Sequence, residues 1–587
     1  MFTTRPTLQG TFGMVASTHW LATASAMAVL EDDGNAYDAA VAAAFVLHVA
    51  EPHLNGPGGD APIIAAPRGE GPTVICGQGP APAAASAASY RAMGLTSVPG
   101  TGLLAAAVPG AFDAWMLLLR DYGTKRLGDV LRFAIHYAEH GVPIVENIAA
   151  AIAAVRVRFE GEWHESAEIY LPNGEVPRPG DLLRNPVLAA TWRRLLDESS
   201  DADRIGQIDR ARETWHSGFI GEAIEASMRM PATDSTGVAR EGVIERADLE
   251  AFTASVEAPV TYRWRDWTVC KGGPWSQGPV FLQQLALLPQ QLEYGTADFY
   301  HRLIEGTKLA MADREAWYGD AQPVPLDALL SDAYNEQRRA LIDRGTASRE
   351  VRPGSPDGRT PRLVRHESVA GTAAGIGEPT VAGDEGAKGD TCHVDVVDRW
   401  GNMVSATPSG GWLQSNPVMA GLGFPLGTRL QMAWLEEGLP NTLTPGRRPR
   451  TTLTPSLAMQ GDEAVLAFGS PGGDSQDQWT FHTFLGIALR DRVRGGLDLQ
   501  GAIDLPGWHG EGFPDSFYPH DMKPAGVTFE SRVGEDILGE LRERGHDVTV
   551  GGPWSEGRVC AVSRDPRTGV LAAAANPRGM QGYAAGR

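Results

Sequence analysis

The composition of the chain changes abruptly at Thr391, and this change limits how the chain can fold. Residues from about 343 to 390 are rich in Gly, Pro, Arg and Asp and have little hydrophobic periodicity, which predicts a long exposed segment. A β-type run begins at Thr391 and extends to Val397, a turn follows, and Met403 to Thr407 is typical of a returning strand. The sequence therefore predicts a hairpin that begins where an exposed linker ends.

Helical and strand-like patterns follow one another along the rest of the chain. Ser17 or Thr18 can cap a first helix through Leu30, and Asn35 can cap an Ala-rich second helix to about Ala50. Residues 157–250 are mixed and mostly helical in pattern. Further helical patterns cover 111–156, 280–287 and 298–318. Short buried strands are predicted at 63–66, 73–76 and 464–470, and a strand pair at 260–264 and 267–270.

The net charge and the cysteine content limit which binding partners and which cellular compartment we expect. The 587-residue chain has a formal net charge of −21, which argues against nucleic acid or an anionic membrane surface as the main partner and favours a small molecule. Its four cysteines have spacings that suit neither a metal site nor a disulfide framework, which is typical of a reducing compartment. No signal peptide and no membrane span are predicted, so we expect a cytoplasmic protein.

The junction at Thr391 has a chemical interpretation as well as a structural one. A Thr that becomes a chain N-terminus after peptide cleavage carries its own general base, because a free α-amine has an ordinary pKa of about 7.7–8.0. Such a Thr needs no separate His to activate its hydroxyl. The alternative is that Thr391 merely starts a strand.

Gly472 and Gly473 are a second candidate site. They follow a predicted strand and precede a helical pattern, so their backbone N–H groups can point at a developing oxyanion, with the helix dipole adding to the field. One such donor typically contributes about 3–4 kcal/mol to lowering a barrier. The alternative is an ordinary tight turn.

Nine segments in order along the chain resemble the γ-glutamyltransferase family of N-terminal-nucleophile hydrolases. The resemblance runs from about residue 13 to 585. The segments are 13–17 (GMVAS), 34–43 (GNAYDAAVAA), 51–53 (EPH), 108–110 (VPG), 312–314 (ADR), 389–393 (GDTCH), 448–455 (RPRTTLTP), 469–473 (GSPGG) and 575–578 (ANPR).

The resemblance implies an α/β fold, a four-layer αββα sandwich, and a precursor that cuts itself between Asp390 and Thr391. Residues 1–390 would form a large subunit, with the linker at about 343–390, and residues 391–587 a small one that stays associated with it in a single αββα domain. No cofactor and no metal are expected. The carried-over roles are Thr391 as nucleophile and base, Thr407 and Ser409 as hydroxyls near it, Gly472 and Gly473 as oxyanion hole, and Thr451 and Thr452 as substrate-contacting hydroxyls.

Two departures from the family concern the substrate. No Arg precedes the VPG segment in residues 101–107, where the family holds the α-carboxylate of a glutamyl group, and no acid stands in residues 427–434 to hold the α-amino group. A glutamyl head would lose two charge-assisted anchors of about 1.5–3 kcal/mol each. Residues 427–434 and 472–479 resemble a cephalosporin-acylase-like branch instead. Arg429, Gln431, Asp474 and Gln476 are candidates for a different acyl pocket, with Arg429 as an anion partner, or are solvated surface residues.

Three functions are therefore compared. The first is a self-processing threonine hydrolase or acyltransferase that attacks a small-molecule amide or acyl substrate. The second is a hydrolase of a C–C bond beside a keto acid, as in relatives of 4-alkylproline antibiotic pathways. The third is an inactive family member with a binding role, against which the presence of Thr391 and both glycines argues. Whether the paired subunits form a homo-oligomer is left open.

Overall fold

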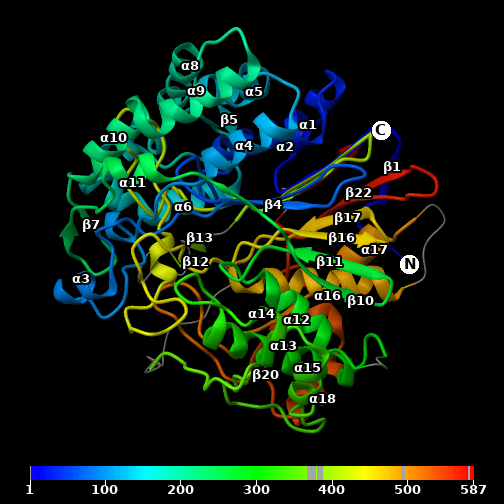
Figure 1. The fold of residues 1–587 in the computed structure, drawn as a ribbon. Helices are drawn as coiled ribbons and strands as arrows, with labels where there is room; N and C mark the ends of the chain where they lie inside the picture. The colour runs from blue at the N-terminus through cyan, green and yellow to red at the C-terminus, as the bar shows by residue number, and fades with distance from the viewer. Residues whose placement is uncertain are drawn as a thin grey trace.

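Two seven-stranded sheets face each other at the centre of the protein, and helices cover the outer face of each (Figure 1). The architecture comes from a computed structural model that describes residues 2–289, 291, 293–365, 378–379, 388–389, 391–490, 496–579 and 582–587. The order helices, sheet, sheet, helices is the four-layer αββα sandwich that the family resemblance implies. The α/β fold class expected from the sequence is confirmed.

The first sheet contains the predicted hairpin. Its two strands pair antiparallel, with Val394 opposite Ala406, and the next strand on each side comes from the N-terminal part of the chain. All pairs in this sheet are antiparallel. In spatial order the strands are β23 (Tyr583–Gly586), β2 (Gly13–Ser17), β14 (Val394–Asp398), β15 (Met403–Ala406), β3 (Ala61–Ala66), β4 (Thr73–Gly77) and β9 (Ser255–Glu257).

The second sheet is also entirely antiparallel. It contains the strand pair predicted at 260–264 and 267–270, which forms one edge with Val260 opposite Lys271. Its strands in spatial order are β1 (Leu8–Gly10), β22 (Leu571–Ala575), β21 (Cys560–Arg564), β17 (Glu463–Gly469), β16 (Ser456–Gln460), β11 (Trp267–Lys271) and β10 (Val260–Trp264).

Helices of the large N-terminal part cover the first sheet. Asn35 caps the second of them as predicted, in a capping box with Asp38. The first helix begins later than predicted, because His19 rather than Ser17 or Thr18 is its N-cap. These helices are α1 (Trp20–Glu31), α2 (Ala36–Ala50), α4 (Ala111–Tyr122), α5 (Leu127–His140), α8 (Pro186–Glu198), α9 (Arg204–Ser217), α10 (Phe219–Met228) and α11 (Arg246–Ala251).

A second group of helices covers the other sheet. Aromatic side chains of α16, among them Trp479 and Phe484, pack against this sheet as the sequence pattern predicts. The group comprises α12 (Gly278–Leu287), α13 (Ala297–Trp317), α14 (Leu326–Leu329), α15 (Asp332–Arg339), α16 (Gln476–Leu489), α17 (Leu499–Ile503) and α18 (Glu535–Glu543).

The remaining elements lie outside the two main sheets, and all of them except the 16-residue helix α6 are short. Much of the predicted linker, residues 366–377, 380–387 and 390, lies outside the described residues. Within 343–365 the backbone N–H of Ala347 donates to Arg544 and that of Gly354 to Asp313. These elements are α3 (Ala87–Ala92), α6 (Glu146–Gly161), α7 (His164–Tyr170), β5 (Val142–Pro143), β6 (Leu182–Leu183), β7 (Ala232–Thr233), β8 (Ala239–Arg240), β12 (Glu378–Pro379), β13 (Lys388–Gly389), β18 (Trp508–Gly510), β19 (Gly526–Glu530) and β20 (Asp547–Gly551).

Three hydrophobic clusters fill the spaces between the four layers. One lies between the first sheet and its helices, one between the two sheets, and one between the second sheet and its helices. All four cysteines are free and buried, at positions 76, 270, 392 and 560. Among the described residues, no helix has both the length and the apolar character needed to cross a membrane.

A buried ion pair fastens the second sheet to the helix layer beneath it. Lys271 Nζ, at the end of β11, lies 2.9 Å from Asp477 Oδ1 in the first turn of α16, and neither side chain is exposed to solvent. The same ammonium donates to Ser456 Oγ at 2.8 Å. Burial raises the pKa of Asp477 to about 6 although Lys271 opposes the shift. Each charge therefore depends on the other for compensation.

Removal of one partner should cost more than removal of both. We expect Lys271→Met to lower the free energy of unfolding by about 3–5 kcal/mol, because it leaves the Asp477 carboxylate buried without its cation. The double variant with Asp477→Leu should regain most of this loss. Urea unfolding of the three proteins measures the difference. A double variant as unstable as Lys271→Met alone would contradict this account of the pair.

Candidate functional site

Thr391 lies at an edge of the first sheet where three chain segments meet. It pairs with Ser409 in an isolated antiparallel bridge, and its Oγ1 donates to Ser409 Oγ at 3.3 Å. Ser409 in turn exchanges two backbone hydrogen bonds with Asp60, of 2.8 and 2.9 Å. Residues directly opposite one another in such a ladder point to the same face of the sheet. The hydroxyls of Thr391 and Ser409 are therefore neighbours because of the strand register.

Polar pairs continue along the same face of the hairpin. His393 follows Thr391 by two residues, and its Nδ1 lies 3.0 Å from Thr407 Oγ1 on the opposite strand. His393 Nε2 lies 2.9 Å from Asp395 Oδ2 one further step along. All these side chains are buried, and burial raises the pKa of Asp395. Thr407 is thus hydrogen-bonded to His393, and Ser409 is the hydroxyl that contacts Thr391.

A glycine-rich loop brings Asp60 beside Ser409. A Cβ on Gly59 would lie 2.1 Å from the Ser409 carbonyl oxygen, so only glycine permits the two backbones to approach this closely. Arg429 Nε lies 2.6 Å from Asp60 Oδ2, and both side chains are buried. Burial raises the pKa of Asp60 although Arg429 opposes the shift. The predicted anion partner Arg429 is therefore held by a carboxylate of the protein.

Aromatic side chains surround this ion pair. The Arg429 guanidinium lies 5.4 Å from the ring centre of Trp412 and 6.0 Å from that of Phe517. These two rings form a small buried cluster with Met432. The ring of Phe517 also approaches the backbone of Gly473, at 3.3 Å from where a Cβ would stand. Phe517 thus connects the Arg429 region to the two glycines.

Gly472 and Gly473 have backbone conformations that other residues rarely adopt. Their φ angles are +128° and +52°, and a Cβ on Gly472 would lie 2.0 Å from the Trp479 ring. A short 3-10 turn, η4 (Gly473–Ser475), begins at the second glycine, and α16 follows it at Gln476. Two successive residues with positive φ make a sharp backbone turn just before this helix.

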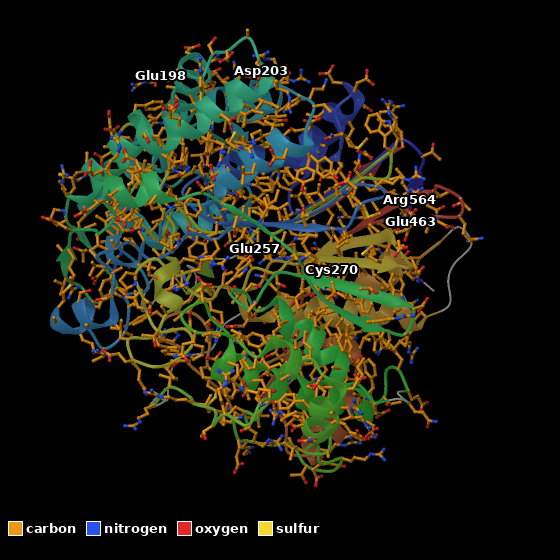
Figure 2. The ribbon with its side chains drawn as sticks, viewed as in Figure 1. Glu198, Asp203, Glu257, Cys270, Glu463 and Arg564 are labelled. Atoms are coloured by element: carbon orange, nitrogen blue, oxygen red, sulfur yellow. The ribbon has the colours of Figure 1, made fainter. Side chains whose placement is uncertain are left out.

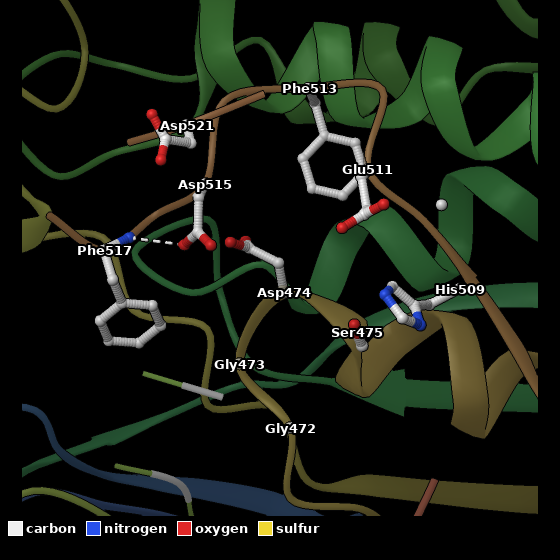
Figure 3. A pocket seen from close by; sticks show the side chains of 11 residues that line it. Gly472, Gly473, Asp474, Ser475, His509, Glu511, Phe513, Asp515, Phe517 and Asp521 are labelled. Carbon is white, nitrogen blue, oxygen red and sulfur yellow. Dashed lines mark hydrogen bonds between the residues drawn. The ribbon is translucent and has the colours of Figure 1, made fainter. Parts of the chain in front are cut away.

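A pair of aspartates lies just beyond the glycines. Asp474 accepts from Arg314 and from the Ser516 backbone, the latter at 2.7 Å. Burial works to raise the pKa of Asp474, but Arg314 outweighs it and the pKa is lowered. The Asp515 carboxyl points toward that of Asp474 (Figure 3), and burial together with the charge of Asp474 raises the pKa of Asp515 well above its ordinary value. Of the two carboxyls, Asp515 is therefore the more difficult to ionise.

The remaining sequence-predicted residues have mainly structural contacts. Gln431 donates to the Gly100 carbonyl and to Thr428 and accepts from the Tyr518 backbone, so it connects three segments. Thr451 forms a backbone bridge with Ser276. The side chains of Thr452 and Gln476 are buried, and their polar atoms have no hydrogen-bond partner among the described residues. Asp390 lies outside the described residues.

Several residues of this region were given no functional role in the sequence analysis. They are Asp60, His393, Trp412, Arg314, Asp515 and Phe517. Asp60 stands in a glycine-rich loop and His393 follows Thr391 by an even number of strand residues, which are signals that sequence reasoning can use. The aspartate pair had no sequence signal, because its members lie 41 positions apart in different loops.

The chain is similar to known proteins along nearly its whole length. The Gamma-glutamyltranspeptidase family model matches residues 22–586. The oxamate amidohydrolase proenzyme of Klebsiella pneumoniae is 30% identical over 603 residues, which cover 98% of each chain. The solved structure of LmbA2991T421A is 66% identical with a TM-score of 0.97, and each chain is covered to 100%. A cephalosporin acylase from Bacillus halodurans is 26% identical with a TM-score of 0.82, covering 100% of this chain and 97% of that one.

The proton on Asp515 should make stability depend on pH. Above about pH 4 the unfolded chain ionises this carboxyl freely, whereas the folded chain keeps it neutral, so wild-type stability falls as pH rises toward the raised pKa. Asp515→Asn mimics the protonated acid. We expect its free energy of unfolding, relative to the wild type, to increase by up to about 1.4 kcal/mol per pH unit over this range. Urea unfolding between about pH 5 and pH 8 measures it. A difference that does not change with pH would contradict the assignment.

Proposed function

The chain belongs to the gamma-glutamyltranspeptidase family, and from this premise we propose that Thr391 is the nucleophile of a self-processing hydrolase or acyltransferase. The observation that carries the proposal is the 3.3 Å contact between Thr391 Oγ1 and Ser409 Oγ at a buried sheet edge. The similar proteins named an amidohydrolase and an acylase support an amide as the substrate. The mixed α and β architecture with antiparallel sheets agrees with this enzyme class.

Self-processing would come first. The Thr391 hydroxyl attacks the carbonyl carbon of Asp390, the peptide C–N bond breaks, and the proton of the hydroxyl passes to the leaving Thr391 nitrogen. The resulting ester is hydrolysed by water, which leaves a carboxylate on residue 390 and a free α-amine on residue 391. Before this step the Thr391 nitrogen is an amide and cannot act as a base. Ser409 Oγ is the hydroxyl that could then align Thr391 for attack.

Turnover would use the amine that self-processing creates. The α-amine of Thr391 accepts the hydroxyl proton as Oγ1 attacks the acyl carbon, and the backbone N–H groups of Gly472 and Gly473 stabilise the oxyanion. The amine then returns the proton to the leaving nitrogen, and an acyl-enzyme remains. Water or a second amine releases the acyl group. Each oxyanion donor in such a site contributes about 2.7–4 kcal/mol to the transition state.

The acyl pocket we propose does not select a charged glutamyl head. Arg429 and Asp60 neutralise each other at 2.6 Å, and Trp412, Met432 and Phe517 supply an apolar wall beside them. Asp60 already compensates the charge of Arg429, so a further buried carboxylate would enter without a cation of its own. Asp474 and Gln476 then contribute to the walls of the acyl pocket and Thr451 and Thr452 to its hydroxyl lining.

Two other functions remain as alternatives with distinct products. Hydrolysis of a C–C bond beside a keto acid would use the same nucleophile and oxyanion hole, but would release a carboxylic acid and a carbon fragment rather than an amine. A binding protein would release nothing and would not need self-cleavage. Mass analysis of the products separates all three.

Self-cleavage is the direct test of Thr391. We expect denatured wild-type protein to give two fragments that join between Asp390 and Thr391, with masses that add up to the 62.6 kDa chain plus one water. Thr391→Ala should remain one uncut chain, whereas Thr391→Ser keeps a hydroxyl and should still be cut. Intact-mass measurement distinguishes these outcomes. One uncut species in all three proteins would favour the binding role.

The acyl preference can be tested with a matched series of p-nitroanilides. The γ-glutamyl, glutaryl and butyryl compounds differ by successive loss of the α-amino group and the carboxylate. We expect no advantage of γ-glutamyl over glutaryl in kcat/KM, because no acid is available in residues 427–434 to hold the α-amino group. A γ-glutamyl advantage of about tenfold or more, equal to roughly 1.4 kcal/mol, would overturn this specificity.

A further inference from the structure

A large cleft opens at the end of β4 and β9, apart from the Thr391 contacts. Its volume is about 710 Å³, which suits a small-molecule ligand. Glu257, at the end of β9, marks the cleft near the middle of the molecule (Figure 2). Apolar walls come from Pro80, Val108 and Phe252. The cleft thus combines apolar surface with charged side chains.

The charged lining has an excess of carboxylates. Arg448 Nη1 lies 2.6 Å from Glu257 Oε1, and its Nη2 lies 2.9 Å from Asp320 Oδ1. The guanidinium therefore lowers the pKa of both acids in spite of their burial, so both are ionised at neutral pH. Asp248 is a third carboxylate in the lining. Three acids against one arginine give the cleft a negative field that favours a cationic ligand.

Gln78 adds a specific acceptor to this field. Its side chain is 1% exposed and lines the cleft. The Nε2 group donates to the carbonyl of Gly79 at 3.3 Å, whereas Oε1 has no hydrogen-bond partner among the described residues. A buried carbonyl oxygen without a donor costs about 1–3 kcal/mol, so a ligand N–H that meets it recovers this energy. The Gln78 acceptor and the negative field of the carboxylates together favour a ligand group that donates a hydrogen bond and carries a positive charge.

Strand register connects the cleft to Thr391. Ala61, the first residue of β3, pairs with Gly77, the last residue of β4, so Asp60 and Gln78 flank this pair on the same side. Thr391, Ser409 and Asp60 form one row across three chain segments, and Gln78 follows the strand next to that of Asp60. Three strand spacings of about 4.8 Å place the segment of Gln78 about 14 Å from that of Thr391. The cleft therefore lies within the length of one extended small molecule from Thr391.

We propose that this cleft binds a primary or secondary ammonium group on an apolar stem, as the end of the substrate distal to the bond that Thr391 attacks. The ammonium donates to Gln78 Oε1 within the field of Glu257 and Asp320, and the stem contacts Val108 and Phe252. The inference rests on the proposed function for its role, but binding itself requires no chemistry at Thr391.

Three probes of equal shape test the charge preference. They are 4-phenylbutylamine, 4-phenylbutan-1-ol and 4-phenylbutyrate, which carry a positive, a neutral and a negative end. Calorimetric titration of Thr391→Ala protein should give the amine a Kd about tenfold below that of the alcohol, and the butyrate should bind most weakly. The amine advantage should shrink as salt is added. Equal affinities, or no amine binding at millimolar concentration, would overturn the proposal.

Two variants assign the preference to this cleft. Gln78→Met removes the acceptor at similar volume and Glu257→Gln removes one charge, so each should reduce the amine-to-alcohol ratio severalfold while alcohol binding persists as a sign of an intact cleft. Glu198→Gln changes the net charge equally at the far end of α8 (Figure 2) and is the matched control. Unchanged ratios in both cleft variants would contradict the site. Because the uncut Thr391→Ala protein is used, failure of self-cleavage in the wild type is a separate result.

Discussion

The antiparallel register at one edge of the first sheet is the constraint on which the site depends. Backbone hydrogen bonds connect the segments of Thr391, Ser409 and Asp60, and Ala61, the residue after Asp60, pairs with Gly77, the residue before Gln78. A slip of one residue would turn a side chain in this row to the opposite face. The close approach that Gly59 permits is what holds the loop of Asp60 in this register.

Buried ion pairs are a second constraint on how the chain packs. Asp60 with Arg429, Asp477 with Lys271 and Asp474 with Arg314 each join segments that are far apart in the chain. Such pairs contribute little net stability, because desolvation of two charges offsets most of their attraction. They do oppose any alternative packing that would leave one partner alone.

Particular elements show how far the sequence predicts the fold. The hairpin after Thr391 and the cap of Asn35 are confirmed, because both depend on local patterns of alternation and hydrogen bonding. The cap of the first helix was predicted wrongly. Ser17 lies in a strand, and the Thr18 hydroxyl donates to the buried Glu51, so His19 takes the position. A distant partner outcompeted a local preference there.

The sequence by itself determined the family resemblance, the hairpin after Thr391, several further strands and helices, and the candidate site residues. It could do so because motifs and periodicities are properties of neighbouring residues. Only the tertiary structure decided that Asp60 neutralises Arg429, that burial and Asp474 raise the pKa of Asp515, and that Gln78 lies beside the segment of Asp60. These relations join residues from separate segments, and the energy of a charge or an acceptor is fixed by burial and by the partner that strand register and sheet packing bring to it.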